Sequence, residues 1–239
     1  MNETPYLEAV KIDDRTYRIE DNSIPPHVRC FLFIGDENAL LVDSCTGQSG
    51  SLKAIVESLT DKPVILLNTH ADFDHIGGNA EFGPAHIHHA EKEHYFMSAD
   101  KDAEIQPLWG NSEIDIGGRC FEILFIPGHT PGSVALLDRE NRILVIGDSV
   151  ATVPVFMFGE MRNFNAYIES MKMIAMLHKS GAFDTIYPSH GPFPIPGGQV
   201  EKMIAAAQKM LAGELAPMEP PFELPAKMYE HDGAAFFYN

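Results

Sequence analysis

The sequence predicts one α/β domain in which packed β-sheets carry helices on their outer faces. Short apolar runs have the length of strands, and other stretches place apolar residues at helical spacing. The strand runs occur in groups that are separated by single helices, which is typical of sheets covered by helices. No repeat or linker precedes Gly213, so we treat residues 1–239 as a single domain.

The predicted strands are short apolar runs that lie between turn residues. In chain order they are Thr16–Ile19, Cys30–Ile34, Ala39–Val42, Val64–Leu67, His86–His88, Cys120–Ile126, Val134–Asp138, Ile143–Ile146 and Thr185–Tyr187. Runs of this length bounded by turn signals are more typical of strands than of helices.

The predicted helices have apolar residues at intervals of three and four. The first spans Leu52–Leu59. The second spans Phe164–His178, with Asn163 as a plausible N-cap and Gly181 as its stop. The third spans Val200–Leu211.

The C-terminal tail, residues 213–239, is rich in proline and is expected to be extended. Its aromatic residues suggest that it docks, either on the body of the domain or on a neighbouring subunit, and a homodimer is consistent with the second arrangement. These residues are Phe222, Phe236, Phe237 and Tyr238.

The charge of the chain limits its partners. Its 17 Lys and Arg against 34 Asp and Glu give a formal net charge of −17 at pH 7. Such a field repels phosphate backbones and anionic lipids, so we expect a small-molecule substrate, with no nucleic acid and no membrane as partner. The N-terminus lacks a basic segment followed by an apolar one, and no stretch is apolar enough to span a bilayer, so we expect a cytoplasmic protein. The 3 cysteines are expected to pack as small apolar residues.

The segment Asn68–Asn79 holds the densest group of metal-binding side chains. His70, Asp72, Asp74 and His75 follow an apolar run and precede a glycine pair. Ionisable groups at this density repel and desolvate one another unless a cation lies among them. Imidazole and carboxylate together suit zinc, iron or manganese, so the sequence predicts a metal site here.

Further candidate ligands stand where other predicted strands end. They are His129 in a Gly-His-Thr turn, Asp148 in a Gly-Asp-Ser turn and His190 in a His-Gly pair, and Asp43 ends an earlier strand in the same manner. Taken singly, each has an ordinary explanation as a turn or cap residue. Strand ends that meet at one edge are a natural place to assemble a site, so their number and order carry the signal.

These motifs resemble those of the metallo-β-lactamase-fold superfamily of metal-dependent hydrolases, over about Tyr17 to Gly191. The resemblance implies a four-layer αββα sandwich of two mixed β-sheets, with two divalent metal ions at one sheet edge. It also implies a role for each candidate. His70, Asp72 and His129 would bind the first metal, Asp74, His75 and His190 the second, Asp148 would bridge them, and Asp43 would hold the motif loop by hydrogen bonds.

The chain departs from the family motif at Asp72, where most hydrolases of the family have histidine. The three carboxylates of the ligand set and one hydroxide would neutralise two divalent ions, so the centre would be a weaker Lewis acid. Zinc remains the first expectation, with iron or manganese as alternatives. Flavodiiron proteins of this superfamily carry an acidic residue, glutamate, at the same position.

The resemblance implies an enzyme that uses a binuclear metal-bound hydroxide to cleave an ester, thioester, lactone or related carbonyl bond in a small molecule. Asp74 would also be catalytic, by orienting the nucleophile or carrying a proton. Two alternatives stay open: a flavodiiron-like di-iron redox protein and a non-catalytic metal-binding module. Anomalous scattering at the metal edges would count ions and ligands and separate all three, and elemental analysis of the purified protein is the most informative single observation.

Two long, apolar-rich connections are candidate substrate walls. The loop Asp100–Ser112 carries Trp109, and the stretch Ala151–Arg162 carries Phe156, Met157 and Arg162. The histidines near the predicted strand at His86–His88 are not expected to bind metal, because the resemblance places this strand after the metal-binding loop, where the superfamily has no ligands.

Overall fold

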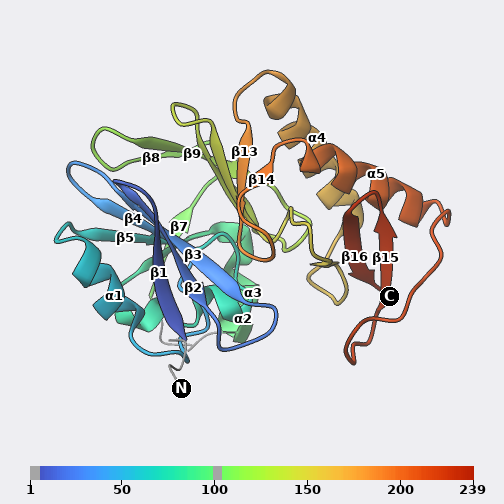
Figure 1. Cartoon of the computed structure of the whole chain (residues 1–239), viewed down its shortest axis with the longest axis horizontal. Coiled ribbons are helices and arrows are strands. Elements are labelled where there is room, and N and C mark those ends of the chain that lie inside the picture. Colours follow the sequence, from blue (N-terminus) through green and yellow to red (C-terminus); the bar gives the residue numbers. More distant parts are fainter. Residues whose placement is uncertain (1–5, 99–103) are drawn as a thin grey trace. The chain divides into compact units, whose positions relative to one another are not determined.

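The computed structural model describes residues 6–98 and 104–239. The chain divides into two compact units, residues 1–122 and residues 123–239. The boundary falls inside strand β9 (Cys120–Phe125). Both units combine β-strands with helices, and the two large sheets are mixed (Figure 1). The predicted α/β fold class is therefore confirmed.

The first unit is built on a seven-stranded sheet of order β1-β2-β3-β4-β5-β6-β7. Its strands are β1 (Leu7–Asp13), β2 (Thr16–Asp21), β3 (Val28–Ile34), β4 (Ala39–Val42), β5 (Val64–Leu67), β6 (Ala85–His88) and β7 (Ile105–Leu108). Strands β1 to β4 pair antiparallel, whereas β4 to β7 pair parallel. Parallel pairing brings the carboxyl ends of β4 and β5 to the same edge, and the loops that follow them meet there.

Short helices join the strands of the first unit. They are α1 (Leu52–Leu59), α2 (Phe73–Ile76), α3 (Lys92–Ser98) and the 3₁₀ helices η1 (Asn79–Glu81) and η2 (His89–Glu91). Helix α1 buries Leu52 and Val56 against the sheet core, and its N-cap Ser51 accepts a hydrogen bond from the backbone N–H of Ala54. Strand β8 (Glu113–Asp115) pairs antiparallel with β9.

The second sheet has the order β14-β13-β11-β10-β9-β8. Its strands in the second unit are β10 (Val134–Asp138), β11 (Ile143–Gly147), β13 (Thr185–Pro188) and β14 (Ile195–Pro196). Strands β11 and β13 are parallel neighbours, so their carboxyl ends also share an edge. Helices α4 (Phe164–Lys179) and α5 (Gln199–Leu211) pack against each other, and their apolar faces enter the core of this unit (Figure 1).

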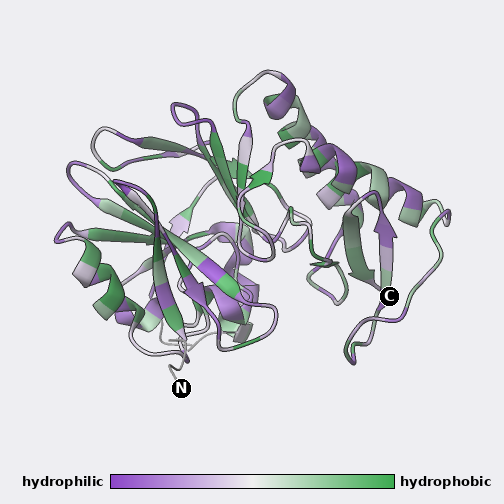
Figure 2. Ribbon diagram, in the orientation of Figure 1, coloured by the Kyte–Doolittle hydropathy of each residue, from purple (hydrophilic) through white to green (hydrophobic). Residues whose placement is uncertain are grey.

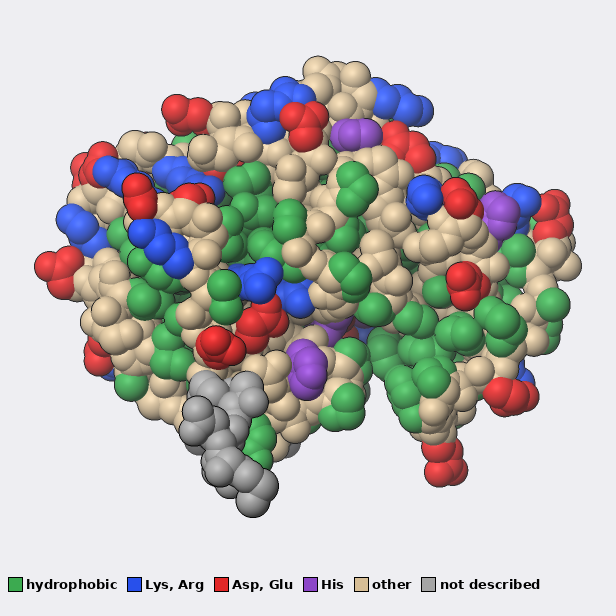
Figure 3. All heavy atoms as spheres, in the orientation of Figure 1, with side chains coloured by type: hydrophobic (Ala, Val, Ile, Leu, Met, Phe, Trp, Pro, Cys, Tyr) green, Lys and Arg blue, Asp and Glu red, His purple; other side chains and the backbone are tan. Residues whose placement is uncertain are grey.

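The C-terminal tail forms strands within the second unit. Strands β15 (Lys227–His231) and β16 (Ala234–Tyr238) are antiparallel, and β16 pairs with β12 (Val155–Phe156). Figure 2 shows β16 as hydrophobic along its length, and Phe236 and Phe237 are buried. Hydrophobic side chains gather over these strands in Figure 3. Phe222, which precedes β15, is exposed.

The sequence-based boundaries agree closely with the main elements. Asn163 caps α4 by accepting the backbone N–H of Ala166, and Gly181 follows its end with a φ of 78°. The sequence missed β1, β7, β8, β12, β14, α2, α3 and the 3₁₀ helices η1 and η2, as well as the tail strands. One expectation was wrong: Cys120 is exposed, whereas Cys30 and Cys45 are buried. Within the described part of the chain, no helix is long and apolar enough to cross a membrane.

Candidate metal centre

The motif segment leaves the carboxyl end of β5 as a buried loop and then forms the short helix α2. The side chains of His70 and His75 are 1% and 0% exposed, and Asp74 is also buried. Asp72 lies at the N-cap position of α2 with an extended backbone. The apolar residues of β5 anchor one end of this loop in the core, so its polar residues are held together rather than dispersed into solvent.

These four side chains form one cluster in the first unit. His70 Nε2 lies 3.4 Å from an oxygen of Asp72. His75 Nε2 lies 3.9 Å from an oxygen of Asp74, and the rings of His70 and His75 have their centroids 4.0 Å apart. Buried imidazoles and carboxylates at these separations suit a shared cation.

Asp43 supports this cluster from the end of β4. One oxygen accepts the backbone N–H of Thr69 at 2.7 Å, and the other accepts the Thr69 hydroxyl at 2.8 Å and His75 Nδ1 at 2.9 Å. Because an ionised carboxylate only accepts hydrogen bonds, Nδ1 of His75 carries the proton. Nε2 of His75, which lies 3.9 Å from an oxygen of Asp74, then carries the lone pair of the ring. Asp43 is held at a φ of 66°, a left-handed conformation that is uncommon for aspartate and often marks a functional position.

The glycine pair after α2 allows the motif loop to approach the loop that follows β4. A Cβ atom at Gly77 would lie 2.0 Å from the carbonyl oxygen of Thr46, and one at Gly78 would lie 2.5 Å from that of Ser44. The same contact includes a hydrogen bond from the Gly77 N–H to the Cys45 carbonyl at 2.9 Å. The loop carrying Asp43 is therefore packed directly against the loop carrying the ligand candidates.

Two further residues of the first unit reach this cluster, and the sequence analysis missed both. His94, on α3, places Nε2 3.3 Å from the second oxygen of Asp72, and its Nδ1 lies 3.0 Å from an oxygen of Glu91. Glu91 is 0% exposed and also accepts the backbone N–H of Ala71 at 2.9 Å. Burial raises the pKa of Glu91. The hydrogen bond with His94 and the proximity of His70 lower this pKa by a larger amount, so it lies below its usual value. The Glu-x-x-His spacing at the start of a helix was the available signal.

The second unit gathers three further candidates at the ends of its strands. His129 follows β9, Asp148 follows β11 and His190 follows β13. One oxygen of Asp148 lies 3.9 Å from His129 Nε2 and 3.3 Å from His190 Nε2. Both imidazoles are buried. The carboxylate of Asp148 therefore lies beside two imidazoles from different strand ends.

Helix α4 holds two of these turns in place. A Cβ atom at Gly128 would lie 2.3 Å from the Cα of Tyr167, so the turn before His129 packs directly on the helix backbone. The Tyr167 hydroxyl donates to the carbonyl oxygen of Ser149 at 2.7 Å, which fixes the turn that contains Asp148. Burial raises the pKa of Tyr167, so its hydroxyl keeps its proton for this bond.

The residues present fit divalent metals of the expected kind. Each unit contributes only imidazole and carboxylate donors at these positions, and the paired imidazole and carboxylate atoms lie 3.3 to 3.9 Å apart. Such a donor set suits zinc, iron or manganese, and thiolate ligands are not part of it. The fold therefore carries candidate metal-binding groups in both units.

The candidate substrate residues lie in different environments. Residues 100–103 of the predicted wall are outside the described residues, but Trp109 is 60% exposed and its ring stacks on His89 with centroids 4.9 Å apart. Phe156 is half-buried on β12, and Arg162 is also half-buried. Met157 is 1% exposed and belongs to the hydrophobic core of the second unit.

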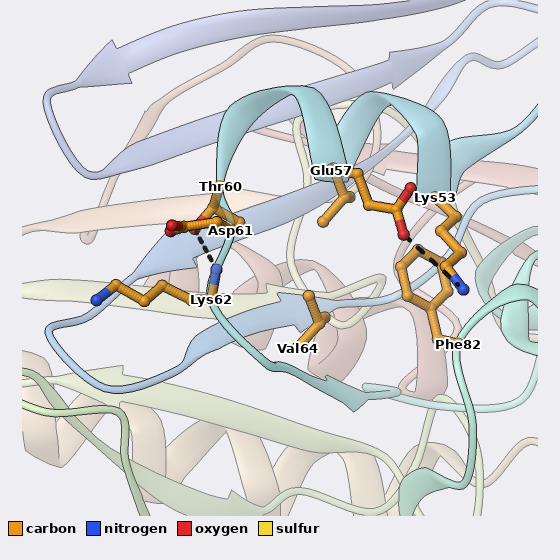
Figure 4. A pocket seen from close by; sticks show the side chains of 8 residues that line it. Lys53, Glu57, Thr60, Asp61, Lys62, Val64 and Phe82 are labelled. Atoms are coloured by element: carbon orange, nitrogen blue, oxygen red, sulfur yellow. Dashed lines mark hydrogen bonds and ion pairs between the residues drawn. The ribbon is translucent and has the colours of Figure 1, made fainter.

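A surface pocket of about 310 Å³ lies elsewhere in the first unit (Figure 4). It is lined by residues of α1, by the connection to β5 and by Val64 at the start of β5. The ligand candidates follow Leu67, at the other end of the same strand. None of the residues that line this pocket is a ligand candidate, so it is separate from the cluster.

Comparisons with known proteins agree with these features. The sequence model of the metallo-beta-lactamase superfamily matches residues 24–216. The acyl-coenzyme A thioesterase MBLAC2 of Gallus gallus is 24% identical over 196 residues, covering 67% of this chain and 71% of that protein. The hydroxyacylglutathione hydrolase GloC of Haemophilus influenzae is 30% identical over 138 residues, covering 50% of this chain and 65% of that protein. A metallo-beta-lactamase from Pontibacter korlensis shares the fold, with a TM-score of 0.70 and 18% identity over 84% of this chain and 99% of that chain.

Proposed function

The chain belongs to the metallo-beta-lactamase superfamily and is a hydrolase, and from this premise we propose that it cleaves thioesters, or closely related carbonyl esters, of small molecules with the help of two divalent metal ions. The thioester class is supported by two relatives, an acyl-coenzyme A thioesterase and a hydroxyacylglutathione hydrolase. Zinc is the first expectation for the metal, with iron or manganese as alternatives.

The proposed site combines the candidate groups of the two units. In this proposal His70, Asp72 and His129 bind one ion, Asp74, His75 and His190 bind the other, and Asp148 bridges them. The observation that carries the proposal is the position of Asp148. Its carboxylate lies 3.9 Å from His129 and 3.3 Å from His190, two imidazoles that we assign to different ions. A carboxylate between the ligands of two ions is suited to bridging them.

Two bound divalent ions would supply a nucleophile by lowering the pKa of a water molecule, and they would polarise the carbonyl group of the substrate. Asp74 is buried beside His75, and we assign it to orient the attacking water and to receive its proton. Asp43 keeps the proton of His75 on Nδ1, so that Nε2 remains a donor of its lone pair.

The charge of the site favours a thioester over an amide. The three carboxylates, Asp72, Asp74 and Asp148, would reduce the positive charge of two ions and weaken their action on a carbonyl. A thiol with a pKa of about 8.5 leaves readily as the thiolate, whereas an amide nitrogen must gain a proton before it leaves. A weaker electrophilic centre is therefore sufficient for thioester cleavage.

Among the candidate substrate residues, we propose that Trp109, Phe156 and Arg162 contact the substrate. Each retains exposed surface that a ligand could cover. We leave Met157 out of this set, because its side chain is 1% exposed and packs in the core.

A substrate panel tests the proposed reaction. Metal-loaded protein would be offered an acyl-coenzyme A thioester, an S-acylglutathione, the matched oxygen ester, a lactone and a β-lactam, with thiol release and product formation as readouts. We expect the thioesters to be cleaved fastest.

We expect Asp74→Asn to lower kcat by roughly 100-fold or more, as loss of an acid–base group does. The variant His178→Gln, at a histidine paired with Glu201 on the outer helices, is the matched control and should retain activity. Failure of the loaded protein to cleave any thioester, or full activity of a His70→Ala/His129→Ala variant, would contradict the proposal.

A further inference from the structure

Two histidines near the motif loop, His75 and His94, each have Nδ1 close to a carboxylate oxygen. His75 places its Nδ1 2.9 Å from a carboxylate oxygen of Asp43, and His94 places its Nδ1 3.0 Å from a carboxylate oxygen of Glu91. Metal-binding histidines in proteins almost always donate their second ring N–H to a carboxylate or carbonyl. His94 therefore has the same supporting contact as His75, a residue of the family motif.

The other ring nitrogen of His94 faces the motif. Asp72 lies between two imidazoles, with one oxygen 3.4 Å from His70 Nε2 and the other 3.3 Å from His94 Nε2. His70 is a ligand candidate of the first ion. His94 approaches the carboxylate of Asp72 at the oxygen that His70 does not approach. Because Asp72 stands where most hydrolases of the family have histidine, the cluster regains at His94 the imidazole that the motif lacks.

Glu91 links His94 to the backbone of the motif loop. Its carboxylate is 0% exposed and accepts both His94 Nδ1 and the backbone N–H of Ala71, the residue between His70 and Asp72. A buried carboxylate is costly unless it is hydrogen-bonded and compensated by nearby positive charge. With Nδ1 donating to Glu91, the lone pair of a neutral His94 lies on Nε2, facing an acceptor oxygen of Asp72. Nε2 and this oxygen lie 3.3 Å apart, a separation at which one cation can be coordinated by both.

We propose that His94 is a metal ligand, which binds the first ion together with His70 and Asp72 and is oriented for this by Glu91. This inference rests on the proposed metal site. The ion at this position would then be held by an imidazole from α3 in addition to those of the motif loop, although the motif has lost one histidine.

Metal affinity gives a readout that is independent of activity. We would load wild-type protein, His94→Ala and His94→Gln with zinc or cobalt(II), and measure stoichiometry by elemental analysis and affinity by competition with a chelator. The visible spectrum of the cobalt forms would report the ligand environment. Circular dichroism would confirm that the variants are folded, and His178→Ala would be the control, since its imidazole pairs with Glu201 at 3.3 Å in an equivalent way.

If His94 is a ligand, His94→Ala and His94→Gln both lower the affinity for one of the two ions by about 10-fold to 100-fold or more, and both change the cobalt spectrum. Added free imidazole restores binding in His94→Ala. The glutamine variant separates a ligand from a hydrogen-bond donor, because its side-chain amide can still donate to Asp72. Wild-type affinity and spectrum in His94→Gln would overturn the proposal, as would unchanged metal binding in His94→Ala. A wild-type protein that binds no metal would instead contradict the proposed metal-dependent function, on which this inference rests.

Discussion

At the scale of single residues, hydrogen bonds behind the cluster decide which atoms can bind a metal. Asp43 accepts hydrogen bonds from Thr69 and from His75 Nδ1, and it can do so only as a carboxylate with two acceptor oxygens. An asparagine at this position would offer an N–H₂ group to one of these donors. The tautomer and orientation of His75 would then no longer be fixed.

We therefore predict that Asp43→Asn weakens metal binding by about 10-fold to 100-fold, the range found for partners of metal-binding histidines. Chelator competition on the purified variant measures this change. Asp61→Asn, at an exposed aspartate of the same unit, is the control. An unchanged affinity in Asp43→Asn would show that this residue does not support a metal ligand.

The residues of the family motif could be predicted from the sequence because four of them are adjacent and the others stand at strand ends next to glycine. Glu91 and His94 could not be recognised in the same way. Their proximity to the motif depends on α3 bringing His94 back to Asp72, and this helix is short and mostly polar. The burial of Met157 could not be predicted for a related reason, since the sequence shows an apolar residue but not the direction of its side chain.

At the scale of elements, the contact between the motif loop and the loop after β4 depends on glycine. Gly77 has an ordinary φ of −62°, so its requirement is steric and not conformational. We predict that Gly77→Ala lowers the free energy of unfolding by about 1–3 kcal/mol, as overpacking does, because its Cβ would meet the Thr46 carbonyl. Denaturant unfolding measures the change.

The control for this substitution is Gly198→Ala. Gly198 has a φ of −63°, and a Cβ atom there would have no heavy atom within 4 Å. The free energy of unfolding of Gly198→Ala should therefore stay near that of the wild type. Equal stability of the two variants would mean that the loops are not in close contact.

Asp21, at the end of β2, ties this strand to the loop after β4. Burial raises the pKa of Asp21. Hydrogen bonds from Ser49, Thr46 and Ser23 lower this pKa by a larger amount, so it lies below its usual value. A carboxyl group whose pKa is lower in the folded state stabilises the fold above its unfolded pKa, about 3.9, and loses this contribution as the pH falls through and below that value.

We predict that the unfolding free energy of the wild type decreases from pH 5 to pH 3 more steeply than that of Asp21→Asn, which cannot titrate at this position. Denaturant unfolding at each pH gives the two slopes, with Asp61→Asn as the control. Identical slopes for wild type and Asp21→Asn would contradict the lowered pKa. At pH 7 the asparagine variant should be the less stable protein, because an amide cannot accept all of these hydrogen bonds.

The long elements could be predicted from the sequence because their apolar periodicity and caps agree with the packing, as in α1 and α4. The tail strands could not, since four prolines between Ala216 and Ala226 dominate that segment and β15 and β16 begin only after them. Strand β12 has only two residues, and it exists because β16 pairs with it. Such elements are stabilised by tertiary contacts rather than by local pattern.

At the scale of the whole molecule, the formal net charge of −17 favours the binding of cations. Ions that bind only the folded protein stabilise it by mass action, by about 2.7 kcal/mol at 100 times the dissociation constant. We predict that a chelator lowers the thermal unfolding midpoint and that zinc restores it. The His70→Ala/His129→Ala variant should show a smaller response to both additions. An equal midpoint with and without chelator in the wild type would argue against a structural contribution from metal.

The central claim is that this chain binds two divalent ions through the imidazoles and carboxylates at its strand ends. Elemental analysis of the purified wild-type protein, never exposed to chelator, tests this most directly. We predict about two ions per chain, with zinc, iron or manganese as the element, and a clear loss in the His70→Ala/His129→Ala variant. A folded wild-type protein without bound metal, or a double variant with the same metal content as the wild type, would contradict the claim.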